Sequence, residues 1–226
     1  MTLPRPQDRR GGGTTALLDV AAADLRLPHT ESGMTVGLFG GSFDPPHAGH
    51  LLVAETALRR LQLDRLWWIV TPGNPLKRHE RTHSLGERIA ASRHIAAEPR
   101  IDVTAFEAAH RLRYTADTLA LVRQRRPDVH FVWVMGADSL ASFHRWQDWR
   151  GIVGTMPIAV VDRPGATLSI LSSPMAKTFS RFRLSEADGA ALPFRKAPAW
   201  VFLHGPRSPL SSTALRSGEA SGGARS

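Results

Sequence analysis

Short apolar runs alternate with longer amphipathic segments from about residue 35 onward, and this alternation limits the possible folds more than any other feature. Each run has the length of a buried strand, and leucines recur at helical spacing after the first of them. The candidate strands are Thr35–Phe39, Leu66–Val70, Ile101–Val103, Phe131–Met135, Ile158–Val161 and, more weakly, Trp200–Leu203. Strands that alternate with helices form βαβ units, so the pattern predicts an α/β fold with a doubly wound, mostly parallel sheet.

Helices are expected between these strands. They are predicted to start near His47, with leucines recurring as far as Leu61, and to cover Ser84–Ala97, Thr115–Arg125 and a less regular stretch around Leu168–Phe182, after which Glu186–Pro198 reads as a loop. In doubly wound sheets, ligands bind beyond the carboxyl ends of the strands. A binding site is therefore expected on the loops that follow Phe39, Val70, Met135 and Val161.

The chain reads as one folded domain with an extension at each end. Residues 1–33 contain several Gly and Pro breakers and are predicted to be a flexible extension, in which only Leu17–Leu27 could be helical. Residues 34–216 are predicted to form a single domain, for which the length is sufficient to bury a core. The Gly- and Ser-rich residues 217–226 are predicted to be a flexible tail.

Composition narrows the function classes. The chain is 42% apolar and 22% charged, which is ordinary for a globular protein, and no apolar run reaches the 18 or so residues of a membrane span. It has no cysteine, which excludes disulfides and thiolate metal sites. The formal net charge of +9 suits a polyanionic partner or a phosphorylated substrate. The basic residues are scattered and do not alternate with aromatics, so we expect no nucleic-acid partner. Without a hydrophobic signal core, a membrane span or cysteine, the chain is expected to be cytoplasmic and to have no membrane partner.

The segment Gly40–His50, with the sequence GGSFDPPHAGH, has the features of a phosphate-binding loop. Paired glycines after a strand allow the backbone N–H groups to approach an anion, and the helix that follows directs its positive end toward the same point. His47 and His50 are three residues apart at that helix start, so both rings can face a phosphate. Alone, a Gly-Gly pair is usually only a tight turn. A pair of histidines three residues apart is more often exposed on the surface or part of a metal site. The combination of strand, Gly-Gly, Pro-Pro, the two histidines and helix is specific. No further histidine follows at a familiar ligand spacing, which argues against a zinc site.

This segment resembles the signature of the HxGH nucleotidylyltransferase superfamily, and the chain most resembles its bacterial nicotinate-nucleotide adenylyltransferases between about Val36 and Arg216. The resemblance implies a Rossmann-like nucleotidylyltransferase fold. It also implies that His47 and His50 are catalytic and stabilise the transition state at the α-phosphate of ATP. The residues of this segment that it implies for ATP binding are Phe39, Gly40, Gly41, Ser42, Phe43 and Gly49.

Further motifs match the ATP side of the family. Gly136 and Asp138 follow a strand, and the resemblance implies that they hold the adenosine, although Asp138 could simply cap the next helix. Arg163 lies in a turn that resembles one near the adenine. The segment Leu210–Arg216 resembles the terminal ISSTxxR motif, with leucine in place of isoleucine, and its hydroxyl and guanidinium groups suit the β- and γ-phosphates. The implied ligands there are Ser211, Ser212, Thr213 and Arg216.

Other motifs match the side of the phosphate-bearing acceptor. Lys77 ends a proline-bounded loop and is implied to contact a phosphate, whereas a single loop lysine is otherwise usually solvated. Tyr114 and Thr115 open a helix, where Thr115 is predicted to act as a cap and is implied to lie beside the pyridine ring. Trp146 resembles the family tryptophan that stacks on this ring, and we prefer it to Trp149, which reads as a core residue.

The resemblance implies that the chain transfers AMP from ATP to nicotinate mononucleotide, with Mg²⁺ bound through the ATP phosphates and no metal held by the protein. A nicotinamide mononucleotide or phosphopantetheine acceptor is the nearest alternative. A basic nucleic-acid-binding protein or a non-catalytic nucleotide sensor is more distant. Only ten residues follow Arg216, where the family usually continues with helices, and the oligomeric state is not predicted.

Overall fold

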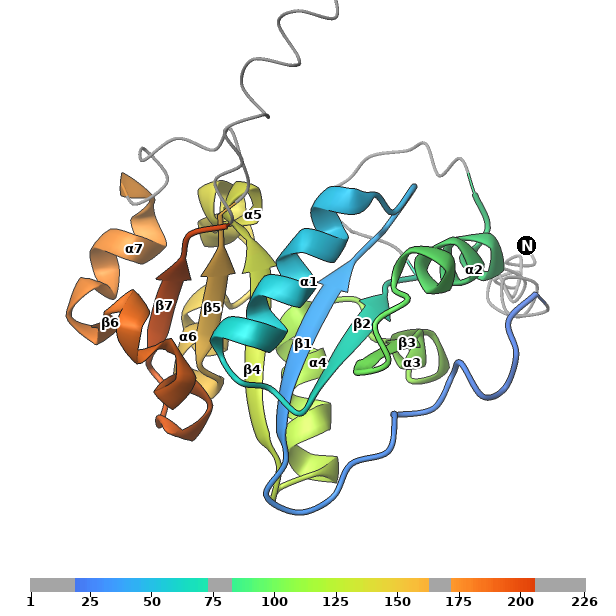
Figure 1. Cartoon of the computed structure of the whole chain (residues 1–226), viewed down its shortest axis with the longest axis horizontal. Coiled ribbons are helices and arrows are strands. Elements are labelled where there is room, and N and C mark those ends of the chain that lie inside the picture. Colours follow the sequence, from blue (N-terminus) through green and yellow to red (C-terminus); the bar gives the residue numbers. More distant parts are fainter. Residues whose placement is uncertain (1–18, 73–82, 163–171, 206–226) are drawn as a thin grey trace, which may run out of the picture.

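The computed structural model describes residues 19–72, 83–162 and 172–205, and within them a seven-stranded sheet forms the centre of the molecule (Figure 1). The strands lie in the order β3-β2-β1-β4-β5-β7-β6, and every neighbouring pair is parallel. Their bounds are β1 Thr35–Gly41, β2 Arg65–Val70, β3 Ile101–Thr104, β4 His130–Gly136, β5 Ile158–Val161, β6 Arg183–Leu184 and β7 Trp200–Leu203. The predicted doubly wound α/β fold is confirmed.

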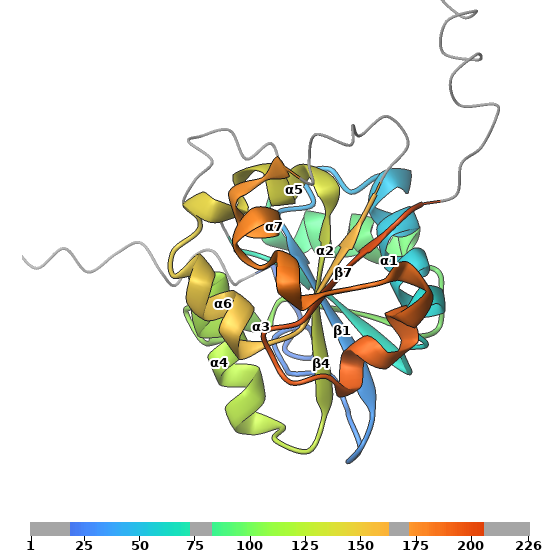
Figure 2. The ribbon, with the colours of Figure 1, turned by 90° about the vertical axis from the view of Figure 1, so that its left-hand side faces the viewer.

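Helices cover both faces of this sheet, with α1 on one side and α4 and α6 on the other (Figure 2). The α-helices are α1 Ala48–Arg60, α2 Leu85–Ile95, α3 Phe106–Ala109, α4 Thr115–Arg125, α5 Ala137–Ser142, α6 Trp149–Thr155 and α7 Pro174–Thr178. The 3₁₀ helices are η2 Phe143–Arg145, η4 Ser180–Phe182 and η5 Glu186–Phe194. No helix in the described ranges is both long and apolar enough to span a membrane.

Alternation along the central strands builds two apolar cores. In β2, Leu66, Trp68 and Val70 belong to the core beneath α1 and α2, whereas Trp67 and Ile69 belong to the core beneath α4. All five side chains are fully buried. A strand that is buried on both faces reads as a continuous apolar run, which is why this pattern was recognisable in the sequence.

The strand order reverses between β1 and β4, and the two strands separate at their carboxyl ends. Their pairing ends at Phe39 and Val134, after which Gly40–Gly41 continues beside β2 and Met135–Gly136 continues beside β5. Ligands of doubly wound sheets bind in the crevice at such a switch point. The fold thus brings the predicted phosphate loop and the predicted adenosine-binding segment to the same edge of the sheet.

The region between β5 and β7 differs from the sequence prediction. Part of the expected helix is present as α7 and η4, and residues 163–171 lie outside the described residues. The predicted loop over Glu186–Pro198 is wrong, because η5 occupies Glu186–Phe194. Ser185 caps η5 by accepting the N–H of Asp188, and Leu192 is buried against the core beneath α1. The short helices α3 and α6 were also not predicted, and α5 was considered only as a helix that Asp138 might cap.

Residues 19–33 were predicted to be part of a flexible extension, but the structure packs them against α2 and β3. The carbonyl of Asp24 accepts the N–H of Ala105 at 2.7 Å and the hydroxyl of Thr104 at 3.1 Å. The buried carboxylate of Asp24 pairs with Arg93 of α2. Residues 19–27 contain turns and bends in place of the suggested helix. These partners are some 70 to 80 residues away in sequence, so local patterns could not reveal the docking.

Candidate active site

The phosphate loop begins inside β1, because Gly40 and Gly41 are its last two residues. A Cβ atom at Gly40 would lie 2.7 Å from Cη2 of the buried Trp133 indole. Such an approach leaves room only for hydrogen. The indole of β4 therefore gives Gly40 a packing role that was not predicted, and the expected close approach of a ligand stays a prediction.

Phe43 turns the chain out of the sheet with a positive φ of 45°. This conformation is uncommon for a residue other than glycine, and surrounding packing must hold it. The Phe43 ring is 2% exposed and lies 4.6 Å from the Trp68 ring, 5.4 Å from Phe39 and 5.0 Å from His50, between centroids. Because Phe39 and Phe43 are both buried, their predicted contact with ATP would be made by the main chain.

His47 and His50 cap helix α1 with their own ring nitrogens. The N–H of Gly49 donates to Nδ1 of His47 at 3.1 Å, and the N–H of His47 donates to Nδ1 of His50 at 3.2 Å. The ring centroids are 3.8 Å apart. Because each Nδ1 accepts a hydrogen bond, each neutral ring carries its proton on Nε2. The capping thus prepares two N–H donors next to the positive end of a 13-residue helix, which suits an anion.

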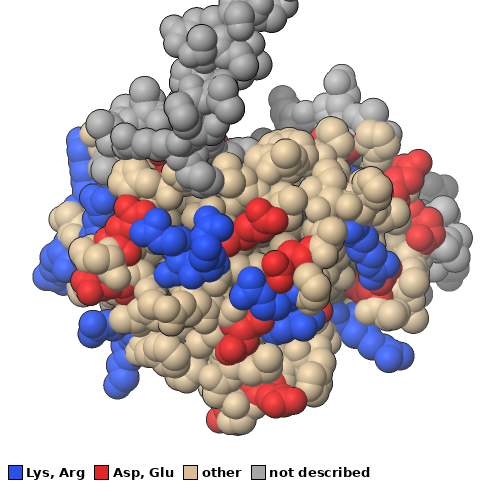
Figure 3. All heavy atoms as spheres, viewed as in Figure 1, with Lys and Arg blue, Asp and Glu red and all other residues tan. Residues whose placement is uncertain are grey.

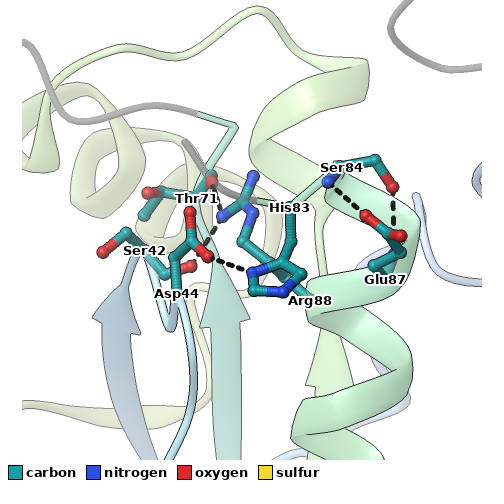
Figure 4. Close-up of polar contacts among 7 residues, drawn as sticks. All are labelled: Ser42, Asp44, Thr71, His83, Ser84, Glu87 and Arg88. Carbon is teal, nitrogen blue, oxygen red and sulfur yellow. Dashed lines mark hydrogen bonds and ion pairs between the residues drawn. The ribbon is translucent and has the colours of Figure 1, made fainter. Parts of the chain in front are cut away.

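The loop that joins β1 to α1 is held by a polar network from helix α2 (Figure 4). One guanidinium nitrogen of Arg88, Nη1, donates to the carbonyl of Ser42 at 2.6 Å and to that of Thr71 at 2.9 Å. Nδ1 of His83 lies 2.7 Å from the carboxylate of Asp44. This network was not predicted from the sequence. Arg88 lies on the buried face of α2 with Leu85 and Ser92, which the local sequence does not reveal.

Gly136 and Asp138 lie across the switch point from the phosphate loop. Gly136 ends β4 and is the N-cap of α5, without a side-chain cap. Asp138 is the second residue of α5 and is exposed, so it does not occupy the cap position that was its structural alternative. Its predicted role at the ribose stays a prediction, and its position beyond the carboxyl end of β4 suits that role.

Tyr114 and Thr115 open helix α4. Tyr114 occupies the N-cap position and makes no side-chain capping bond, so the prediction that Thr115 caps the helix is wrong. The helix gains a different polar contact one turn later, where the buried hydroxyl of Thr118 donates to the carboxylate of Glu107 at 2.6 Å. Burial raises the pKa of Glu107 to about 7, and the hydrogen bond from Thr118 opposes this shift. Glu107 was not identified from the sequence.

Trp146 and Trp149 are both half-buried and both lie near Phe143, but their other ring contacts differ. The Trp146 ring lies 5.2 Å from Phe143 and 6.3 Å from Trp133, the indole that abuts Gly40. The Trp149 ring lies 6.0 Å from Phe179, beyond α7. Trp146 is therefore connected to the phosphate loop through one aromatic neighbour, and the preference for it over Trp149 stays a prediction.

Six predicted site residues lie outside the described residues, and their roles stay predictions: Lys77, Arg163, Ser211, Ser212, Thr213 and Arg216. Among residues 19–72, 83–162 and 172–205, no three His, Asp or Glu side chains form a candidate metal cluster. Positive and negative groups are interspersed over the face shown in Figure 3, and no large area of one sign is visible there. This distribution gives no support to the nucleic-acid-binding alternative.

The fold and the site together define a nucleotidylyltransferase-type protein, and residues 38–218 match the cytidylyltransferase-like family. Individual relatives of the chain define the family more narrowly. The chain is 67% identical over 190 residues to a probable nicotinate-nucleotide adenylyltransferase of Mesorhizobium japonicum, covering 84% of this chain and 97% of the relative. It is 68% identical over 187 residues to that of Rhizobium meliloti, covering 83% and 100%. The chain belongs to the nicotinate-nucleotide adenylyltransferase family.

Solved structures agree at the level of the fold. The nicotinic acid mononucleotide adenylyltransferase of Plasmodium falciparum, in its complex with NaAD, has a TM-score of 0.58 at 16% identity and covers 78% of each chain. The complex of the same protein with APC has a TM-score of 0.51 at 18% identity and covers 78% of this chain and 77% of that one. At this identity the likeness shows the shared fold alone.

Proposed function

We propose that the chain transfers AMP from ATP to nicotinate mononucleotide, giving nicotinate adenine dinucleotide and pyrophosphate in NAD biosynthesis. The observation that carries this proposal is the His47–His50 pair at the start of α1, where two Nδ1 acceptors fix two Nε2–H donors beside the switch point of the sheet. High sequence identity to relatives named as probable nicotinate-nucleotide adenylyltransferases supports the choice of acceptor.

In this reaction a 5′-phosphate oxygen of the acceptor attacks the α-phosphorus of ATP in line. The new P–O bond forms as the bond to the bridging α–β oxygen breaks, and the electron pair leaves with pyrophosphate. Phosphoryl-type transfer needs alignment and charge stabilisation more than covalent chemistry. The Nε2–H groups of His47 and His50, together with the positive end of α1, would stabilise the charge that develops on the phosphate oxygens.

The remaining partners are assigned by the same proposal. Gly136 and Asp138 would hold the adenosine, and Tyr114, Thr115 and Trp146 would hold the acceptor. Arg163, Lys77 and the segment 211–216 would contact the nucleotides from outside the described residues. Enzymes of this type use a divalent metal ion, and we propose Mg²⁺, which supplies charge neutralisation at the phosphates. The imidazole and amide N–H groups of the loop are suited to bind phosphate oxygens and not Mg²⁺, which prefers oxygen ligands. We therefore propose that the ion is carried by ATP. We also propose a cytoplasmic location.

The test is pyrophosphate release by the purified chain with ATP and Mg²⁺ in the presence of nicotinate mononucleotide, nicotinamide mononucleotide or phosphopantetheine. We expect the largest kcat/KM for nicotinate mononucleotide and a loss of turnover in His47→Ala. A larger kcat/KM for either other acceptor would replace the proposed substrate. Equal pyrophosphate release by the unsubstituted protein and His47→Ala would contradict the proposed mechanism.

A further inference from the structure

Arg88 lies buried beneath the phosphate loop, and its contacts have a consequence for anion binding. Its side chain is 2% exposed, and the two carbonyls that it binds belong to the segments that follow β1 and β2. The residue comes from the middle of helix α2, not from either segment. One side chain therefore fixes the relative position of two loops at the ligand-binding edge of the sheet (Figure 4).

Carbonyl groups at this edge are unfavourable neighbours for a triphosphate. The peptide groups that leave the carboxyl ends of β1 and β2 have oxygen atoms with partial negative charge, which repel an anion unless a donor engages them. Thr71 precedes Pro72, so the peptide group between them has an oxygen but no N–H to offer a phosphate. The positive guanidinium group of Arg88 binds this oxygen and that of Ser42, and so offsets both partial charges.

The same contact orients an N–H group of the loop. A trans peptide group is planar and holds its C=O and N–H in opposite directions. Because the oxygen of Ser42 is held by Arg88, the N–H of Phe43 in the same peptide group points away from Arg88. The positive φ of Phe43 then turns the chain toward the start of α1. Loss of Arg88 would free this peptide group to rotate and place its oxygen where the N–H now lies.

A second contact from the same region fastens the loop two residues further on. Nδ1 of His83, just before α2, lies 2.7 Å from the carboxylate of Asp44, which is 10% exposed. The Ser84 hydroxyl next to it accepts the N–H of Glu87 and caps α2, which gives His83 a fixed position. Helix α2 and the residue before its N-cap thus hold the loop at Ser42 and at Asp44, on either side of Phe43.

We infer that Arg88, supported by His83, is a positioning residue for triphosphate binding, which acts by holding the Ser42 and Thr71 carbonyls away from the ligand and the Phe43 N–H toward it. This inference rests on the proposed function for the identity of the ligand, a nucleoside triphosphate. It assigns α2, which none of the sequence motifs includes, to the ATP site.

The experiment compares Arg88→Met and Arg88→Lys with Arg93→Met. Arg93 lies on the same helix, but its guanidinium pairs with Asp24, which is outside the loop. The readouts are the Kd for α,β-methylene ATP by calorimetry, the separate KM values for ATP and nicotinate mononucleotide, and the melting temperature. We expect Arg88→Met to raise the Kd and the KM for ATP by about tenfold or more, with a smaller effect on the KM for nicotinate mononucleotide. Lysine, which keeps a cation with several donors, should recover part of the loss.

Arg93→Met should lower the melting temperature and leave the Kd unchanged. His83→Gln provides a second, partly exposed position, where we expect a Kd increase of about threefold. It decides the question if Arg88→Met does not fold. Unchanged Kd values in the folded variants would overturn the inference and leave Arg88 a purely structural residue. Because the analogue does not require turnover, a protein that binds it but releases no pyrophosphate would refute the proposed function and still test the role of Arg88.

Discussion

The phosphate loop and the proposed acceptor side, formed by Tyr114, Thr115 and Trp146, are held by different forces. Directional bonds fix the loop: ring nitrogens cap α1, and Arg88 binds two carbonyls. On the acceptor side, Trp146 packs against other aromatic rings, and Tyr114 opens α4 without a capping bond. A site held by directional bonds tolerates little displacement, whereas a packed site can be reshaped by one side chain. We therefore expect larger losses from substitutions in the loop than from substitutions on the acceptor side.

The largest effect is expected for His47→Asn. Asparagine is a good N-cap, so helix α1 should keep its start, but the Nε2–H donor is lost. We expect kcat to fall by about 100-fold or more, with little change in melting temperature. His94→Asn, at an exposed position in the last turn of α2, is the matched control. A folded His47→Asn protein with kcat near that of the control would contradict the catalytic role of the ring.

Next in size is the pH dependence from Glu107, beneath the acceptor side. Its pKa in the folded protein is raised to about 7, so the folded state keeps a proton that the unfolded state releases near its ordinary value. Stability from this group is therefore fully present below about pH 4.5, is lost as pH rises to about 7, and is level above that. Glu107→Gln removes this pH dependence. The free energy of unfolding of the variant, relative to that of the unsubstituted protein, should therefore be higher at pH 8 than at pH 5 by roughly 2 kcal/mol.

The measurement is urea unfolding of Glu107→Gln and of the unsubstituted protein at pH 5 and pH 8. Glu55→Gln, at an exposed position on α1, serves as the control. Parallel stabilities of Glu107→Gln and the unsubstituted protein across this range would show that Glu107 does not titrate as described.

The smallest effect is expected for Trp146→Leu. Leucine keeps much of the apolar contact with Phe143 but has no aromatic face for a pyridine ring. We expect the KM for nicotinate mononucleotide to rise by about five- to tenfold and the KM for ATP to stay unchanged. Trp149→Leu should lower the melting temperature without changing either KM. The opposite pattern, with the KM effect at Trp149, would move the acceptor pocket toward α7.

The parts of the molecule that the sequence could predict are those in which interacting residues are close in the chain. The phosphate loop is one example, because strand, glycines, histidines and helix start all lie within Phe39–His50. The buried strands are another, since each is a local apolar run. The family resemblance supplied the acceptor, which geometry alone would not have identified.

What could not be predicted depends on contacts between distant residues. Arg88 is 46 residues from Ser42, and Arg93 is 69 residues from Asp24. A lone arginine in an amphipathic helix reads as solvated until the fold shows what it faces. The prediction for η5 failed for a different reason. Its internal Pro193 and low helical regularity indicate a loop, and only the burial of Leu192 makes it a compact 3₁₀ segment.

The docked segment 19–33 also bears on whether copies of the molecule can pair through the edges of the sheet. An open parallel sheet has two edges, and an uncovered edge strand is a template for pairing with another chain. At one edge β6 is only two residues long, which is too short to recruit a partner strand. At the other edge the carbonyls of Asp24 and Arg26 accept bonds from Thr104 at the end of β3. A chain shortened to begin at residue 34 would lose these bonds and expose the end of β3, so we expect it to self-associate more than the full chain.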